Sequence, residues 1–248
     1  MRLYLIALQF LTIIPLPFSV RCGEEDLGRS MSLFPLVGLT IGLFLAGTDY
    51  LLALALPRPV TDLLLVTLLA VVTGALHLDG LADVSDGLAA RGGRERFLAV
   101  MKDSRTGAVG VVGLVLGILL KYETLLNLPL DHKREALLFF PLVARFSQVQ
   151  LTVGAKRARQ DGLGSAFIGG AGLPQFAAAS VISLASGWLL LGVVGVYCTA
   201  TVCLATWIWK SWFHRRLGGI TGDVIGCVSE LNEILCLLAL LALTGGKP

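Results

Sequence analysis

A chain of 248 residues is long enough for one domain, but 55% hydrophobic and 15% charged residues exclude an ordinary soluble protein. The net charge of +3 is too small to indicate binding of nucleic acid. Apolar runs recur along the whole length, so we predict an all-α, polytopic membrane protein whose residues 1–248 form a single membrane-embedded domain.

The first segment, residues 3–17, carries two prolines and is short for a membrane crossing. A bilayer core of about 30 Å needs about 20 mostly apolar residues in one helix. We therefore predict a re-entrant or interfacial helix at the N-terminus. Seven later segments are predicted to span the membrane: 33–56, 63–76, 108–128, 136–153, 175–193, 194–209 and 224–243. The turn between the fifth and sixth spans is expected near Gly192 and Gly195.

Basic residues gather in alternate connecting segments. The richer set comprises Arg21, Arg29, the loop 91–105, Lys156, Arg157, Arg159 and the segment 210–216. Short cytoplasmic loops carry the excess of Lys and Arg in membrane proteins, so we expect this set on the cytoplasmic side of the cell (inner) membrane.

The stretch HLDGLADVSDGL, residues 77–88, is acidic where the chain is otherwise apolar. Asp79, Asp83 and Asp86 would lie within an arc of about 60° on a helix, which predicts an amphipathic extension of the preceding span at the membrane surface. Three such carboxylates favour a hard cation, namely Mg²⁺, Mn²⁺ or Ca²⁺. The flanking Gly80 and Gly87 are expected to leave room for a ligand. The alternative is a solvated acidic helix end, and a lone His77 is more typical of a packed residue than of a metal ligand.

The next segment, MKDSRTGAVG, supplies positive charge. Lys102 and Arg105 bracket Asp103 and Ser104, and Gly107 precedes the following helix. Cations and a helix N-terminus together can bind phosphate oxygens, and Asp103 can join the metal ligands.

A third cluster lies in GGITGDVIGCVSELNE, residues 218–233. If a helix starts near Asp223, then Asp223, Glu230 and Glu233 share an arc of about 80°. The preceding Gly219, Thr221 and Gly222 can form a turn whose amides bind an anion. A further intramembrane charge, Arg145, needs a carboxylate or a phosphate as its partner.

Two acidic stripes, a basic segment and glycine turns on one side of a membrane indicate Mg²⁺-dependent chemistry on a phosphate or diphosphate. A CDP-alcohol phosphotransferase and an aromatic prenyltransferase use similar aspartates, but Asp83 stands where the first expects an arginine, and the chain lacks the repeat that the second expects. A secondary transporter would place its polar groups near the bilayer midplane, whereas these acidic groups cluster at one surface.

The sequence resembles the cobalamin synthase family of adenosylcobinamide-GDP ribazoletransferases. The matching elements are FLTIIPLP (10–17), FPLVGLTIG (34–42), HLDGLADVSDGL (77–88), MKDSRTGAVG (101–110) and GGITGDVIGCVSELNE (218–233). The resemblance implies a multi-spanning, Mg²⁺-requiring enzyme of late cobalamin biosynthesis. Such an enzyme joins adenosylcobinamide-GDP to α-ribazole or its 5′-phosphate and releases GMP.

Together, the residues and the resemblance give a hypothesis for the site. The carboxylates of Asp79, Asp83, Asp86 and Asp103 would hold Mg²⁺ against the diphosphate, while Lys102 and Arg105 neutralise the phosphoryl oxygens. Substrate contacts are expected from Lys102, Ser104, Arg105, Gly107, Arg145, Gly219, Thr221, Gly222, Asp223 and Glu233. The chain shows no evident covalent nucleophile, which predicts direct transfer, and the sequence allows a homo-oligomer.

Overall fold

The computed structural model describes residues 1–16, 22–159 and 163–245, and within these it is helical, which confirms the predicted all-α class. Pro17, the last residue of the predicted N-terminal segment, lies outside them. The elements in chain order are α1 (Arg2–Leu11), α2 (Glu24–Ser30), η1 (Met31–Leu33), α3 (Phe34–Leu52), α4 (Arg58–Val72), α5 (Leu76–Ala89), α6 (Arg94–Met101), α7 (Ala108–Asn127), α8 (Leu130–Thr152), α9 (Leu163–Gly170), α10 (Leu173–Leu191), α11 (Val193–Leu217) and α12 (Gly222–Leu243).

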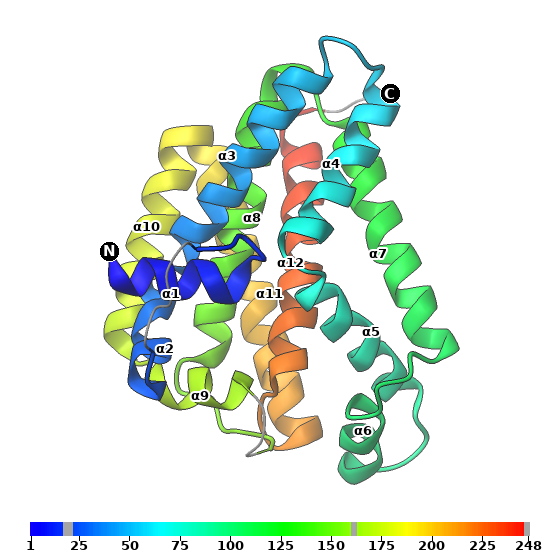
Figure 1. The fold of residues 1–248 in the computed structure, drawn as a ribbon, viewed down its shortest axis with the longest axis vertical. Coiled ribbons are helices and arrows are strands. Elements are labelled where there is room, and N and C mark those ends of the chain that lie inside the picture. The colour runs from blue at the N-terminus through cyan, green and yellow to red at the C-terminus, as the bar shows by residue number, and fades with distance from the viewer. Residues whose placement is uncertain (17–21, 160–162, 246–248) are drawn as a thin grey trace.

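The helix α8 forms the centre of the bundle. It packs along α3 and α12, and α10 and α11 also contact it (Figure 1). Nearly all of its side chains from Ala136 to Thr152 are buried. On α3, Gly42 permits the close approach, because a Cβ there would lie 2.7 Å from the carbonyl oxygen of Leu137. The core is thus built by α8 and the helices that surround it.

Within the described residues, five helices are long and apolar enough to cross a membrane: the continuous segment that ends in α3, and α7, α10, α11 and α12. A sixth span results if the bent pair α4 and α5 is counted as one. The predicted number of seven is therefore not confirmed. The difference lies in α8, which has 23 residues but is less apolar, because it begins with charged residues and carries Arg145.

The aspartate stretch does not continue the preceding span in a straight line. The axes of α4 and α5 differ by 89°. Gly74 (φ 60°) and Ala75 (φ 55°) both adopt the left-handed conformation between them, which is unusual for alanine. The stretch is helical as predicted, and it follows the preceding span across this bend instead of continuing it as one helix.

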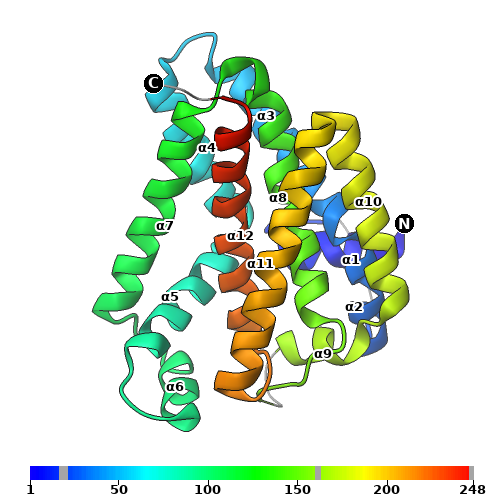
Figure 2. The same cartoon turned by 180° about the vertical axis from the view of Figure 1, so that it is seen from behind.

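The chain turns between α10 and α11 at Gly192, whose φ is +57°, as the sequence predicts (Figure 2). Gly195 has a different part in this hairpin. A Cβ at Gly195 would overlap the backbone of Gly187, so this pair lets the two antiparallel helices touch.

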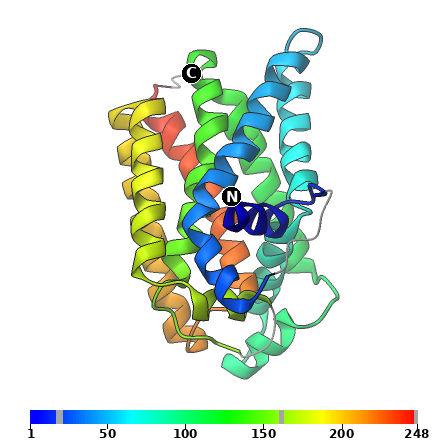
Figure 3. The same cartoon turned by 60° about the vertical axis from the view of Figure 1, so that its left-hand side comes forward.

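With ten residues, α1 is too short to cross a bilayer, in agreement with the prediction. It lies across the long helices, against α3 (Figure 3). Just beyond α1, the Ile13 N–H donates to the Val72 carbonyl at 2.8 Å and so joins this segment to the end of α4.

Three of the basic connecting segments meet at one end of the bundle. Arg94 donates hydrogen bonds to the carbonyls of Leu217 at 2.6 Å and Ala158 at 2.7 Å. Arg216 donates to the carbonyl of Gly92 at 3.1 Å. These segments therefore lie at the same end, as their charge pattern predicts.

Candidate active site

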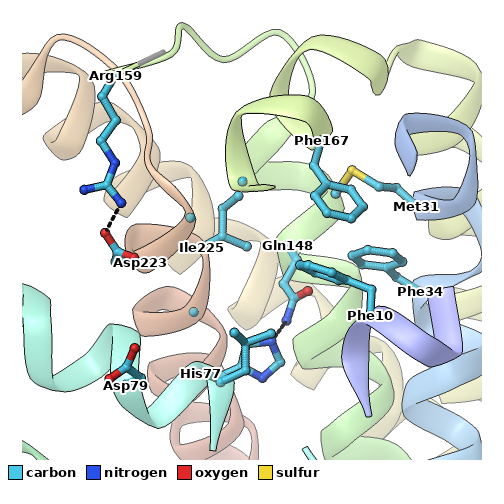
Figure 4. Close-up of a pocket in the computed structure, with 14 residues that line it drawn as sticks. Phe10, Met31, Phe34, His77, Asp79, Gln148, Arg159, Phe167, Asp223 and Ile225 are labelled. Carbon is cyan, nitrogen blue, oxygen red and sulfur yellow. Dashed lines mark hydrogen bonds and ion pairs between the residues drawn. The ribbon is translucent and has the colours of Figure 1, made fainter. Parts of the chain in front are cut away.

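A cavity of about 260 Å³ opens among α1, α5, α8, α9 and α12. Figure 4 shows Asp79, Asp223 and Arg159 on one side of it and three phenylalanines with Met31 on the other. His77 and Gln148 lie between the two sides. The cavity therefore has a charged half and an aromatic half.

The charged half exists because α5 and α12 approach each other closely. A Cβ at Gly80 would lie 2.5 Å from the Asp223 carbonyl oxygen, and one at Gly226 would lie 3.2 Å from the His77 Cα. The two glycines thus bring aspartates from distant segments together. The expectation that Gly80 and Gly87 make space for a ligand is wrong, because Gly80 faces this backbone and Gly87 faces the Phe97 ring.

Asp83 is half-buried beside this contact. It lies within electrostatic reach of the carboxylates of Asp79, Asp86 and Asp223 and of the Arg159 guanidinium. Asp79 is exposed and lines the cavity together with Asp223. Asp79 of the first acidic stripe and Asp223 of the second therefore face the same cavity, with Asp83 within electrostatic reach of both.

Arg159 and Thr221 contact the carboxylate of Asp223. Arg159 donates to Asp223 Oδ2 at 2.9 Å, and the Thr221 hydroxyl lies 3.5 Å from the same oxygen. The Thr221 hydroxyl also accepts from the Val224 N–H at 3.2 Å and caps α12. A guanidinium in this position can bind phosphate oxygens as well as the carboxylate.

Asp86 binds backbone N–H groups at the start of α7. Its two oxygens accept hydrogen bonds from the N–H groups of Gly107 at 2.6 Å and Gly110 at 2.7 Å, at the start of α7. A Cβ at Gly107 would lie 2.6 Å from an Asp86 oxygen, so glycine is required there. The helix N-terminus predicted to bind phosphate through Gly107 is thus occupied by a carboxylate of the protein itself.

The segment between α6 and α7 lies at the surface, and Lys102, Asp103, Ser104 and Arg105 are not among the residues that line the cavity. Arg105 pairs with Asp103 at 2.8 Å. Hydrogen bonds from the Arg105 side chain and backbone lower the pKa of Asp103 to about 2, so this carboxyl is ionised at neutral pH. The predicted roles of these four residues in metal or phosphate binding stay predictions.

The glycine turn before α12 is held by the loop that follows α8. Ile220 donates to the Lys156 carbonyl at 2.8 Å, and Ala158 donates to the Ile220 carbonyl at 2.9 Å. Gly219 packs against the same loop, and Gly222 lines the cavity. Of the turn predicted to bind an anion, Gly222 is the part that faces the cavity.

Glu230 and Glu233 form a buried ionic network deeper in the bundle. Lys121 donates to Glu230 at 2.5 Å and also to Glu233, and Arg145 donates to Glu233. All four side chains are buried. Arg145 thus has the carboxylate partner that its position requires, and neither it nor Glu233 is among the residues that line the main cavity.

The charged half of the cavity contains carboxylates, which are ligands that Mg²⁺ prefers. Among the described residues, no three His, Cys, Asp or Glu side chains are gathered closely enough to hold a metal ion by themselves. Mg²⁺ in phosphate chemistry is usually bound by one or two carboxylates, with waters and substrate phosphates as the other ligands. Asp79 and Asp223 line the cavity and Asp83 lies within electrostatic reach of both, so one or two of these carboxylates fit a Mg²⁺ ion that is shared with a phosphate.

A family model described as cobalamin-5-phosphate synthase matches residues 3–241. The chain belongs to the cobalamin-5-phosphate synthase family. It is accordingly an enzyme, a transferase of cobalamin biosynthesis, and the resemblance carried by the sequence motifs is confirmed.

Relatives named adenosylcobinamide-GDP ribazoletransferase match this family member over nearly their whole length. One from Geotalea daltonii is 74% identical, over 99% of this chain and 99% of its own. Others from Acetivibrio thermocellus and Thermoanaerobacter sp. (strain X514) are 35% and 34% identical, over 94% and 96% of this chain and 95% and 96% of theirs. No solved structure matches the chain.

The cavity also contains residues to which the sequence motifs assign no role in binding or catalysis. The sequence predicts Arg159 only as a loop charge and His77 as a packed residue. The aromatic half was not predicted at all, because its members are phenylalanines in apolar segments and resemble core residues. Their approach to the aspartates depends on tertiary structure alone.

Proposed function

We propose that this enzyme transfers the adenosylcobinamide phosphate of adenosylcobinamide-GDP to α-ribazole or its 5′-phosphate. The products are adenosylcobalamin, or its 5′-phosphate, and GMP. The observation that carries the proposal is the cavity in which carboxylates of α5 and α12 lie beside the Arg159 guanidinium. Both charge types are needed around a diphosphate, since its oxygens accept from cations and the attacking hydroxyl must lose a proton.

In the proposed reaction, the 3′-hydroxyl oxygen of the ribose forms a bond to the phosphorus on the cobinamide arm. The bond from this phosphorus to the oxygen that bridges it to GMP breaks, and GMP leaves with the bond electrons. The hydroxyl proton passes to a carboxylate of Asp79, Asp83 or Asp223. Arg159 stabilises the charge that grows on the departing phosphate.

Mg²⁺ bound by one or two of the carboxylates of Asp79, Asp83 and Asp223 would neutralise charge on the diphosphate oxygens. Asp86 then acts through position, because it fixes the start of α7 next to Asp83. Removal of divalent cations with EDTA should abolish turnover, and added Mg²⁺ should restore it. Unchanged turnover in EDTA would contradict the metal requirement.

The proposed orientation places the end of the bundle that carries the basic segments in the cytoplasm, with the chain in the cell (inner) membrane. This assignment rests on the excess of Lys and Arg at that end. It gives the cavity access to water-soluble substrates. Labelling of single cysteines introduced at Arg91 and at Arg134 in intact cells would distinguish the two sides.

The direct test uses the purified full-length protein in detergent with Mg²⁺, adenosylcobinamide-GDP and α-ribazole. GMP and a completed corrinoid should appear in equal amounts. Turnover of a CDP-alcohol in place of these substrates, by folded protein, would favour the phosphotransferase alternative. A trapped phosphoryl-enzyme would contradict direct transfer.

Asp83→Asn should lower kcat by about a hundredfold or more, because the amide loses the charge and the proton-accepting capacity of the carboxylate. The protein should remain in the membrane with an unchanged unfolding temperature. Glu123→Gln, which neutralises an exposed carboxylate on α7, is the matched control and should retain full activity. Normal activity of Asp83→Asn would refute the proposed role.

A further inference from the structure

The aromatic half of the cavity is built from three phenylalanines on three elements: Phe10 on α1, Phe34 on α3 and Phe167 on α9. The ring of Phe10 lies 4.3 Å from that of Phe167 and 6.2 Å from that of Phe34, between centroids. Phe34 and Phe167 are fully buried, whereas Phe10 is half-buried. The Phe10 ring therefore packs against the other two rings and remains partly exposed.

Two polar side chains at the base of this half have atoms without partners among the described residues. Gln148 Nε2 donates to the Ser229 hydroxyl at 2.8 Å and lies 3.0 Å from His77 Nε2. Gln148 Oε1 and His77 Nδ1 are buried and make no hydrogen bond to the protein. Buried polar atoms are normally satisfied, so these two indicate a water or a ligand that supplies the missing partners.

The surroundings select the kind of ligand. Aromatic rings and Met31 favour a flat ring with few polar atoms, and the two unpaired atoms can serve one or two hydrogen-bonding groups. Guanine carries several donors and acceptors on its edges, most of which this apolar wall would leave unpaired. A cavity of about 260 Å³ also lies below the usual range of about 300–1,000 Å³ for whole small molecules. It therefore suits one heteroaromatic base with its sugar and leaves the corrinoid outside.

We propose that Phe10, Phe34 and Phe167 bind the benzimidazole base of the ribazole substrate, with Gln148 and His77 at its polar edge. The inference rests on the proposed function and assigns a subsite within it. Because both halves belong to one cavity, a base held on the aromatic side directs its ribose toward Asp79 and Asp223 (Figure 4). The aromatic half thereby positions the attacking hydroxyl.

The first test separates the two substrates kinetically. Phe10→Leu and Gln148→Leu should each raise KM for α-ribazole about tenfold, since loss of a stacked ring or of a polar partner weakens base binding. KM for adenosylcobinamide-GDP should stay within twofold.

Phe176→Leu is the matched control, because it removes a ring that stacks on Phe146 at 6.0 Å and is not among the cavity residues. It should change neither KM. Equal increases in both KM values, or none, would overturn the proposal.

The second test uses the wild-type chain, so it does not depend on how well a variant folds. A photoreactive azidobenzimidazole riboside should label peptides from residues 2–16 or 163–170, and excess α-ribazole should prevent the labelling. Labelling confined to residues 94–107 would overturn the subsite. If the wild type bound the probe as expected but released no GMP from adenosylcobinamide-GDP, the proposed function would fail and the base site would stand.

Discussion

Asp83 and Asp86 lie three residues apart on one helix, yet their surroundings differ. Asp86 accepts two backbone N–H groups from the start of α7, while Asp83 lies among Asp79, Asp223 and Arg159. Spacing predicts the shared helix face correctly. It does not predict the amides that occupy Asp86, because these lie beyond a separate helix and their position depends on how the intervening chain folds back.

This difference leads to a paired test at Asp86. Asp86→Asn should keep most of the activity and part of the stability, because its amide oxygen accepts from one of the two backbone N–H groups while its NH2 group cannot accept from the other. Asp86→Ala should lower the free energy of unfolding by about 0.5–2 kcal/mol. Unfolding temperatures in detergent and turnover rates measure the two effects. Complete inactivity of a folded Asp86→Asn variant would show that the charge itself is needed, as is expected of a metal ligand.

At the scale of elements, the contact between α5 and α12 determines whether the acidic groups meet. Periodicity and apolar runs predict most helices of this bundle, including the turn at Gly192. They do not predict the 89° bend before α5, because alanine at position 75 gives no signal of a left-handed conformation. The glycines of the aspartate motif alone favour space for a ligand, whereas in the structure Gly80 serves helix packing.

Gly80→Ala should therefore separate α5 from α12. The added methyl would meet the Asp223 carbonyl oxygen, so we expect a loss of about 1–3 kcal/mol in stability together with a loss of activity. Gly47→Ala in α3 is the control, since a Cβ there has no neighbour within 4 Å and alanine favours a helix by about 1 kcal/mol. Thermal unfolding and turnover should fall for the first and not for the second. Equal behaviour of the two variants would contradict the packing role.

At the scale of the whole molecule, buried charges join three helices. Lys121 on α7, Arg145 on α8 and two glutamates on α12 balance one another in the interior. The sequence predicts that Arg145 needs an anionic partner but does not identify it. Glu233 is 88 residues away along the chain, and a substrate phosphate would meet the same need.

Charge balance predicts the result of a double-mutant cycle in this network. Lys121→Met alone should cost about 3–5 kcal/mol of stability, because it leaves an uncompensated carboxylate in the interior. Adding Glu230→Gln should recover part of this loss, since Arg145 and Glu233 then remain as a neutral pair. Unfolding in detergent measures each variant. Strictly additive losses would argue against the coupling.

The composition of the cavity wall also has a consequence for the order of events during synthesis. Phe10 belongs to α1, whereas Asp223, Ile225 and Gly226 belong to α12, which is translated after the other elements that line the cavity. A nascent chain that lacks α12 can insert the earlier helices, but it has no closed cavity and leaves Arg159 without Asp223. The site is therefore completed only after α12 has been translated, and a product that ends before α12 cannot contain it.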